Sequence, residues 1–228
     1  LPGGDAGRLA GATHARGRRR PGSGLHRPRP HAHGALVEYF NLFSVNLNKL
    51  RLDPSNGADD FDQKVIDSIE QFIPFRSELI EIIATIAQYD NTNTSAPVIH
   101  RFFESLIPYL ERPEDVTRYH KWDWDNFKFI VQESLIVCIA ILLKYERYDI
   151  VEHLLNQRYY VEKEENYSRS KMRSFGVFRN HLESLNHRKR RLKLNRLSLH
   201  ADLMKERCTA SGISFNQIMQ ADFLLYLA

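Results

Sequence analysis

The feature that most constrains the fold is the segment from Trp122 to Arg147, which is apolar on nearly every side at helical spacing. Its longest apolar run, Ser134 to Leu143, is ten residues long and lies between Glu133 and Lys144. A membrane-spanning helix needs about 20 such residues, whereas a helix that is apolar all round is typical of a domain interior. The sequence therefore predicts a buried central helix and no membrane span.

Around this segment, apolar residues recur at steps of three and four, which is the spacing of helices with one buried face. Ser95 and Ser214 stand where helix N-caps are expected, and Tyr159 to Val161 reads as a brief extended stretch. The sequence predicts an all-α fold, an irregular multi-helix bundle around one apolar central helix. The further helices expected are 36–50, 59–72, 74–89, 95–110, 148–156, 175–192, 194–208 and one that begins at Ser214.

Residues 1–34 differ from the rest of the chain in composition. They hold eight of the eleven glycines and seven arginines, and they contain no Ile, Val, Phe, Tyr, Trp or Met. Such a segment buries too little apolar surface to offset the entropy of ordering it. We expect a disordered Arg/Gly/Pro-rich tail, either a nucleic-acid-binding arm or a non-native leader. Residues 35–228 form the helical domain, and we expect it to be truncated, because the chain stops inside the apolar run Phe223 to Leu227.

The charge of the chain is unevenly distributed. The formal net charge is +4 and the pI is about 9.0, but the tail alone carries +6 and leaves −2 for residues 35–228. The basic pI therefore says little about partners of the helical domain. Cys138 and Cys208 are 70 residues apart, which fits neither a disulfide framework nor a zinc motif. A reducing, cytoplasmic location follows as the expectation.

The strongest charged feature of the domain is the basic run 187–196. Six of its side chains are candidates for binding nucleic-acid phosphates, each neutralised charge adding salt-sensitive affinity: Arg188, Lys189, Arg190, Arg191, Lys193 and Arg196. The alternative is a solvated helix face that pairs with an acidic neighbour such as Glu162, Glu164 and Glu165. The near-neutral charge of the domain favours this alternative.

Arg196 and His200 invite comparison with HEPN ribonucleases, which are small helical domains. In that family an arginine holds the phosphate and a histidine four to six residues later does acid–base work on the 2′-hydroxyl. Here only three residues intervene, and the polar residue Asn195 precedes the arginine. Because the spacing departs from the family pattern, an RNA-binding or RNA-cleaving domain remains the alternative function.

The segment Trp122 to Asn126, with the sequence WDWDN, is a candidate for binding a ligand through its aromatic and acidic side chains. Such a stretch is more often a capped helix start whose aromatic residues cover the edge of the core. The sequence contains no glycine-rich phosphate loop, no nucleophile elbow and no zinc motif. We predict no catalytic residues, no metal site and no cofactor.

Four stretches together resemble the helical region that follows a TIR-like (SEFIR) domain in some bacterial proteins. They are Trp122–Phe129, Ile141–Arg147, Arg191–Leu203 and Met219–Phe223. The resemblance spans roughly residues 35–228 and implies a role in bacterial antiviral defence or signalling, as a sensing, regulatory or oligomerisation region. The residues that cleave NAD in some TIR-like domains have no counterpart here. We therefore expect a non-enzymatic region whose partners are proteins or a second copy, with nucleic acid possible at the basic run.

Overall fold

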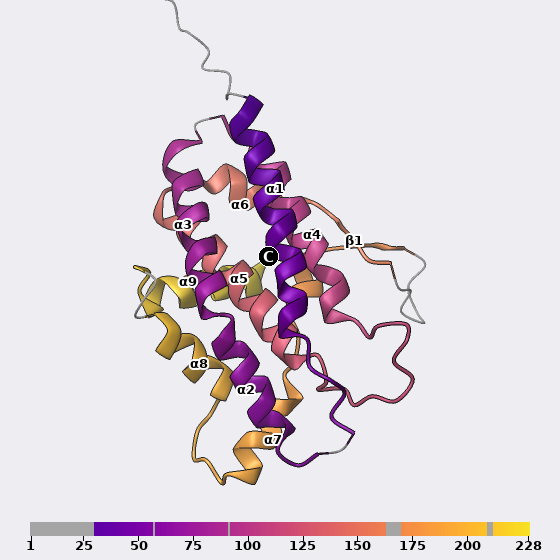
Figure 1. Cartoon of the computed structure of the whole chain (residues 1–228). Helices are drawn as coiled ribbons and strands as arrows, with labels where there is room; N and C mark the ends of the chain where they lie inside the picture. Colours follow the sequence, from indigo (N-terminus) through magenta and orange to yellow (C-terminus); the bar gives the residue numbers. More distant parts are fainter. Residues whose placement is uncertain (1–29, 57, 91, 163–169, 209–211) are drawn as a thin grey trace, which may run out of the picture.

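The computed structural model describes residues 30–56, 58–90, 92–162, 170–208 and 212–228, with side chains from residue 33 onward. Within these residues the chain forms helices, with one two-stranded antiparallel pairing of β1 and β2 (Figure 1). This confirms the predicted all-α class. The elements are α1 (Pro30–Leu47), η1 (Asn48–Leu50), α2 (Phe61–Gln71), α3 (Ile73–Tyr89), α4 (Ala96–Leu110), α5 (Asp125–Lys144), α6 (Tyr148–Asn156), β1 (Tyr159–Tyr160), β2 (Met172–Arg173), η2 (Phe175–Phe178), α7 (Glu183–Arg191), α8 (Leu199–Arg207) and α9 (Phe215–Leu227).

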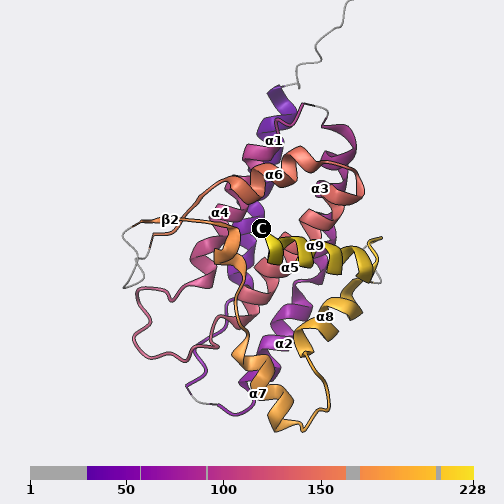
Figure 2. The same ribbon diagram turned by 180° about the vertical axis from the view of Figure 1, so that it is seen from behind.

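Helix α5 is the centre of the bundle, as predicted. Sixteen of its twenty residues are buried, and it packs against α2, α3, α4, α6 and α9. Helix α9 crosses α5 on the face that Figure 2 turns toward the viewer. Among the described helices, α5 alone has the length and composition to cross a membrane, but 83% of its most apolar 18-residue stretch is buried inside this bundle. Burial of that kind is typical of a core helix.

Aromatic side chains join the N-terminal half of the bundle. The ring of Phe40 on α1 stacks on that of Phe102 on α4, with centroids 4.3 Å apart, and Phe43 meets Phe72 edge to face. The break between α2 and α3 lies at Phe72, and Pro74 occupies the first turn of α3, where a missing N–H costs least. The predicted interruption at Pro74 is thereby confirmed.

Three predicted boundaries need correction. Helix α1 begins at Pro30, six residues before the predicted helix start at Leu36. Of the predicted disordered tail 1–34, residues 1–29 lie outside the described residues, and residues 30–34 are helical. The expected helix 175–192 is broken into η2 and α7. Extended backbone at Leu182 (φ −106°, ψ 93°) separates the two and buries the Leu182 side chain. The helix expected over 194–208 begins only at Leu199.

The N-caps are partly as expected. Ser214 forms a complete capping box with Gln217, as in many helix starts. Ser198 caps α8 by accepting a hydrogen bond from the backbone N–H of Ala201 at 3.2 Å. Ser95 makes no side-chain cap, which corrects the prediction, because its hydroxyl donates to the carboxylate of Asp90 instead.

Candidate functional site

The basic run 187–196 occupies the second half of α7 and the turn that follows it. The helix starts where the backbone N–H of Ser184 donates to Asp125 Oδ2 at 2.8 Å. It ends where Lys193 adopts a left-handed backbone (φ 51°), while Leu194 N–H donates to Lys189 O and Lys193 N–H to Arg190 O. This is a Schellman motif. The cations gather in the last turn, where they complement the helix dipole.

Two arginines of the run are held by one buried carboxylate. Arg191 makes a paired contact with Asp62, its Nε 3.1 Å from Oδ1 and its Nη2 2.9 Å from Oδ2. Arg188 Nη1 lies 3.4 Å from Asp62 Oδ2 and donates to Gln63 Oε1 at 2.7 Å. Asp62 is only 2% exposed. The basic run therefore fastens α7 to α2.

The pairing partner differs from the one expected. The carboxylate is Asp62 and not Glu162, which is exposed, while Glu164 and Glu165 lie outside the described residues. Lys189 donates to the backbone carbonyl of Leu197 at 3.4 Å. In the described part of the chain, Arg190 and Lys193 make no ion pair, and both are exposed. These two cations are the ones most accessible to a phosphate.

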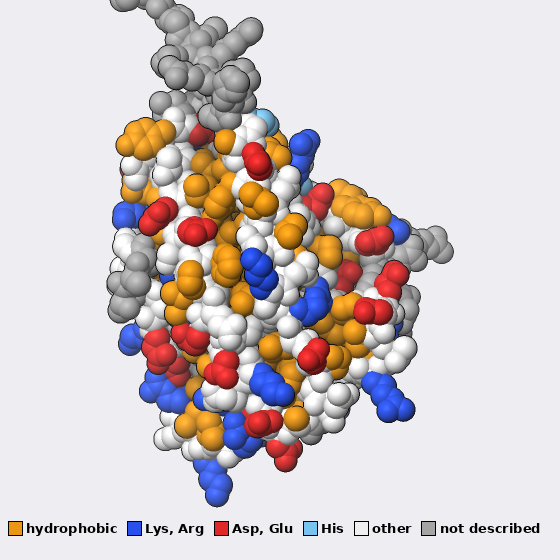
Figure 3. Space-filling view, in the orientation of Figure 1, with side chains coloured by type: hydrophobic (Ala, Val, Ile, Leu, Met, Phe, Trp, Pro, Cys, Tyr) orange, Lys and Arg blue, Asp and Glu red, His pale blue; other side chains and the backbone are white. Residues whose placement is uncertain are grey.

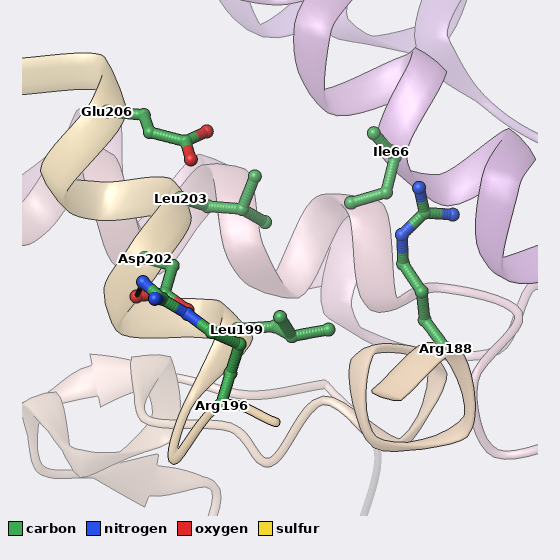
Figure 4. Close-up of a pocket in the computed structure, with 7 residues that line it drawn as sticks. All are labelled: Ile66, Arg188, Arg196, Leu199, Asp202, Leu203 and Glu206. Atoms are coloured by element: carbon green, nitrogen blue, oxygen red, sulfur yellow. Dashed lines mark hydrogen bonds and ion pairs between the residues drawn. The ribbon is translucent and has the colours of Figure 1, made fainter. Parts of the chain in front are cut away.

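Arg196 and Asp202 border a pocket of about 330 Å³ between α2, α7 and α8, with Leu199 and Leu203 on its floor (Figure 4). The guanidinium of Arg196 binds Asp202 in a paired contact, with distances of 2.8 and 2.6 Å. A hydrogen bond from Arg196 lowers the pKa of the Asp202 carboxyl. The arginine is thus already neutralised on the outer side of α8.

His200 does not line this pocket. Its ring packs against Phe129 of α5, with centroids 5.2 Å apart. Burial lowers the pKa of the imidazole, and its Nε2 atom is buried without a hydrogen-bond partner in the described residues. A general base must reach the proton that it removes. The predicted pair is therefore divided, since Arg196 is bound to Asp202 at the surface and the Nε2 atom of the half-buried His200 has no access to it.

The side chains of the WDWDN segment form a network of hydrogen bonds at the start of α5. Trp122 Nε1 donates to Ser55 Oγ at 3.0 Å, and Asp123 accepts from the backbone N–H groups of Ser55 and His120. Asn126 Nδ2 donates to Leu50 O at 2.8 Å. These contacts tie the α1–α2 connection to α5. The segment thus makes structural contacts, but the predicted helix cap is wrong, because the N-cap residue of α5 is Trp124 and no side chain caps the helix.

A buried charge cluster was missed by the sequence analysis. Glu133 lies in the middle of α5 and is 1% exposed. Its Oε1 accepts from Arg76 Nε of α3 and from Arg207 Nε of α8, both at 2.8 Å, and its Oε2 accepts from Arg207 Nη2 at 2.9 Å. Arg207 also donates to Ile69 O at 3.2 Å. The signal in the sequence was an acidic residue in the middle of a largely apolar helix.

Exposed apolar side chains gather on the outer face of α9. Ile218, Ala221 and Leu225 face the core, whereas the opposite face carries four large apolar residues that are 44 to 70% exposed: Met219, Phe223, Tyr226 and Leu227. A second group of hydrophobic side chains lies over α1 and α3 (Figure 3), where Leu42 and Val45 are more than half exposed. Contiguous apolar patches of this kind mark interaction sites.

Within the residues that the structure describes, no three His, Cys, Asp or Glu side chains are grouped so that they could hold a metal ion. Both cysteines are buried, and burial strongly raises the pKa of the Cys138 thiol. A thiol held in the neutral form is a poor nucleophile. Comparisons of the chain with family models, curated proteins and solved structures found no match.

Proposed function

We propose that the helical domain is a non-enzymatic interaction module that self-associates through the outer face of α9. The observation that carries the proposal is the exposure of Met219, Phe223, Tyr226 and Leu227 on one helix. Aromatic residues and methionine are enriched in the buried centre of protein interfaces. A fixed helix face that presents them is suited to protein contact.

The charge of α9 favours a second copy as the occupant. The sole ionisable side chain of the helix before Tyr226 is Asp222, which is half-buried. From outside the helix, the Arg179 guanidinium lies 5.6 Å from the ring of Tyr226, at one end of the patch. A twofold arrangement of two copies would make the same patch serve both partners. In the setting implied by the resemblance to SEFIR-associated regions, self-association would bring neighbouring domains together.

The placement of Arg196 and His200 supports a role without catalysis. The arginine is bound to Asp202, and the histidine Nε2 is buried against α5. The ribonuclease alternative needs both groups at one phosphate. Cleavage of RNA by the chain is therefore an outcome that the experiment must distinguish.

The test measures the molar mass of the purified chain by light scattering over a range of concentrations. We expect a shift from 26.7 kDa toward twice that mass. Phe223→Ser removes the most central apolar side chain of the patch and should weaken association about tenfold, as for an interface hot spot. Leu197→Ser is the matched control, because Leu197 is fully exposed but stands away from α9.

Three results would overturn the proposal. The first is a strict monomer at every concentration, and the second is an equal effect of Phe223→Ser and Leu197→Ser. The third is cleavage of total RNA by the chain that His200→Ala abolishes, since this would establish the ribonuclease instead.

A further inference from the structure

A small basic pocket lies between η1 and α2, away from α9 and from the basic run. Its volume is about 210 Å³, and three cations line it, namely Lys49, Arg51 and Lys64. Asp67 is the acidic residue of the lining. Among the residues that the structure describes, none of the three cations forms an ion pair. In this they differ from Arg188, Arg191 and Arg196.

The guanidinium of Arg51 is held in place by neutral groups. It lies 5.6 Å from the ring centroid of Tyr109 and 5.4 Å from that of Phe127. Its Nη2 lies 3.4 Å from Asn48 Oδ1. Stacking on aromatic rings orients an arginine without neutralising it. Arg51, which lines the pocket, therefore keeps its positive charge beside it.

The other charges leave the pocket positive. Lys49 and Lys64 are exposed. Asp67 is engaged by Gln63 Nε2 at 2.8 Å, which satisfies part of its accepting capacity. Three cations and one carboxylate give a net charge of about +2 at neutral pH. An anion with two negative charges matches this site.

From this geometry we infer that the pocket binds a small ligand through one or two phosphate groups. Arginine presents a planar fork to phosphate oxygens, and two lysines supply mobile charges around it. The small volume of this open pocket suits a phosphate or pyrophosphate group better than a length of nucleic-acid strand.

The pocket is separate from the basic run because the two use different faces of α2. Asp62 and Ile66 face α7 and α8, whereas Lys64, Asp67 and Gln71 line the phosphate pocket. Each helical residue turns the side chain by about 100°, so Asp62 and Lys64 point to nearly opposite sides. Gln63 links the two faces, because its Nε2 donates to Asp67 of the pocket and its Oε1 accepts from Arg188 of α7.

The test is calorimetric titration of the full chain with inorganic pyrophosphate. We expect saturable binding of one pyrophosphate per chain. Lys64→Gln should weaken it about fivefold and Arg51→Lys by a similar factor, since the second change keeps the charge but loses the planar fork. Asp67→Asn should tighten binding about twofold or more, because it removes a repulsive carboxylate. Misfolding cannot produce a gain in affinity of this kind.

Arg190→Gln is the matched control, because it removes an exposed cation without an ion pair from the basic run. Pyrophosphate affinity should stay within about twofold of wild type in this variant, since screening limits the effect of distant charges. The inference is overturned if pyrophosphate binding does not saturate, or if Arg190→Gln weakens it as much as Lys64→Gln. It is also overturned if Asp67→Asn fails to increase the affinity.

Discussion

Two regions of the molecule bind arginine to carboxylate in opposite surroundings. Glu133 holds Arg76 and Arg207 inside the bundle, where all three side chains are almost fully buried. Asp202 holds Arg196 at the surface, where more than half of the arginine side chain is exposed. The bonds are of similar length, yet burial gives them different consequences. The contact distances alone therefore do not show which ion pair contributes more to the free energy of unfolding.

The difference follows from solvation. Removing one member of a buried ion pair leaves a charge without water or partner, which is costly. An exposed pair that is broken regains water on both sides and loses little. The Glu133 cluster therefore fastens α8 and α3 to α5, while the surface pair of Arg196 and Asp202 contributes little to the stability of the fold.

The largest effect is expected for Glu133→Gln. This change leaves the Arg76 guanidinium buried without a counter-charge and leaves Arg207 with Glu70 alone, 3.7 Å away. It should cost about 3–5 kcal/mol of unfolding free energy. Chemical denaturation measures it. Glu152→Gln is the control, because Glu152 lies exposed on α6. Equal stability of the two variants would show that the buried cluster contributes nothing.

Asp62→Asn should have an intermediate effect. The carboxylate is buried, but the arginines that it binds are partly exposed and can recover water. We expect the melting temperature to fall by about 4 °C, with loosening of α7. Asp59→Asn changes an exposed neighbouring residue and should leave the melting temperature unchanged. A loss of stability as large as that caused by Glu133→Gln would contradict the distinction between fully buried and partly exposed ion pairs.

The stability that Asp90 contributes is expected to depend on pH, which extends the comparison. Burial raises the pKa of its carboxyl, but hydrogen bonds from Ser95 and Thr92 outweigh this and lower the pKa to about 2. A carboxyl whose pKa is depressed on folding stabilises the fold above its unfolded pKa, and this contribution is lost as pH falls from about 4 toward 2. Asp90→Asn should reduce stability at neutral pH and narrow its difference from wild type in acid. A pH-independent difference would contradict the assignment.

The smallest effect is expected for Arg196→Gln. The Arg196 side chain is exposed and its pair with Asp202 is screened by solvent. The melting temperature should stay within error of wild type. A clear loss of stability would show that the surface pair also supports the fold.

Much of the fold could be predicted from apolar spacing. The positions of α2, α3, α4 and α5 followed from side chains three and four residues apart, because burial imposes that period on a helix. The helix predicted over 175–192 was wrong because Leu182 is buried from an extended backbone, and Asp125 supplies a start for α7 from a distant part of the chain. Tertiary contacts of this kind leave no local signal.

The candidate sites could be predicted less well. The charges of the run 187–196 were visible, but the partner Asp62 lies more than 100 residues away, and no spacing rule connects them. Glu133 marked the edge of an apolar run in the sequence, whereas in the fold it is the centre of a charge cluster. The pocket at Arg51 depends on two elements, η1 and α2, that only the folded chain brings together.

The central claim is that burial, and not contact geometry, decides which charges hold this bundle together. A double-mutant cycle with Glu133→Gln and Arg207→Gln, followed by chemical denaturation, tests it most directly. We predict a coupling energy of about 2 kcal/mol or more, near the upper end for residues in one network. Additive losses from the two single variants would contradict the account, because they would show that Glu133 and Arg207 stabilise the fold independently.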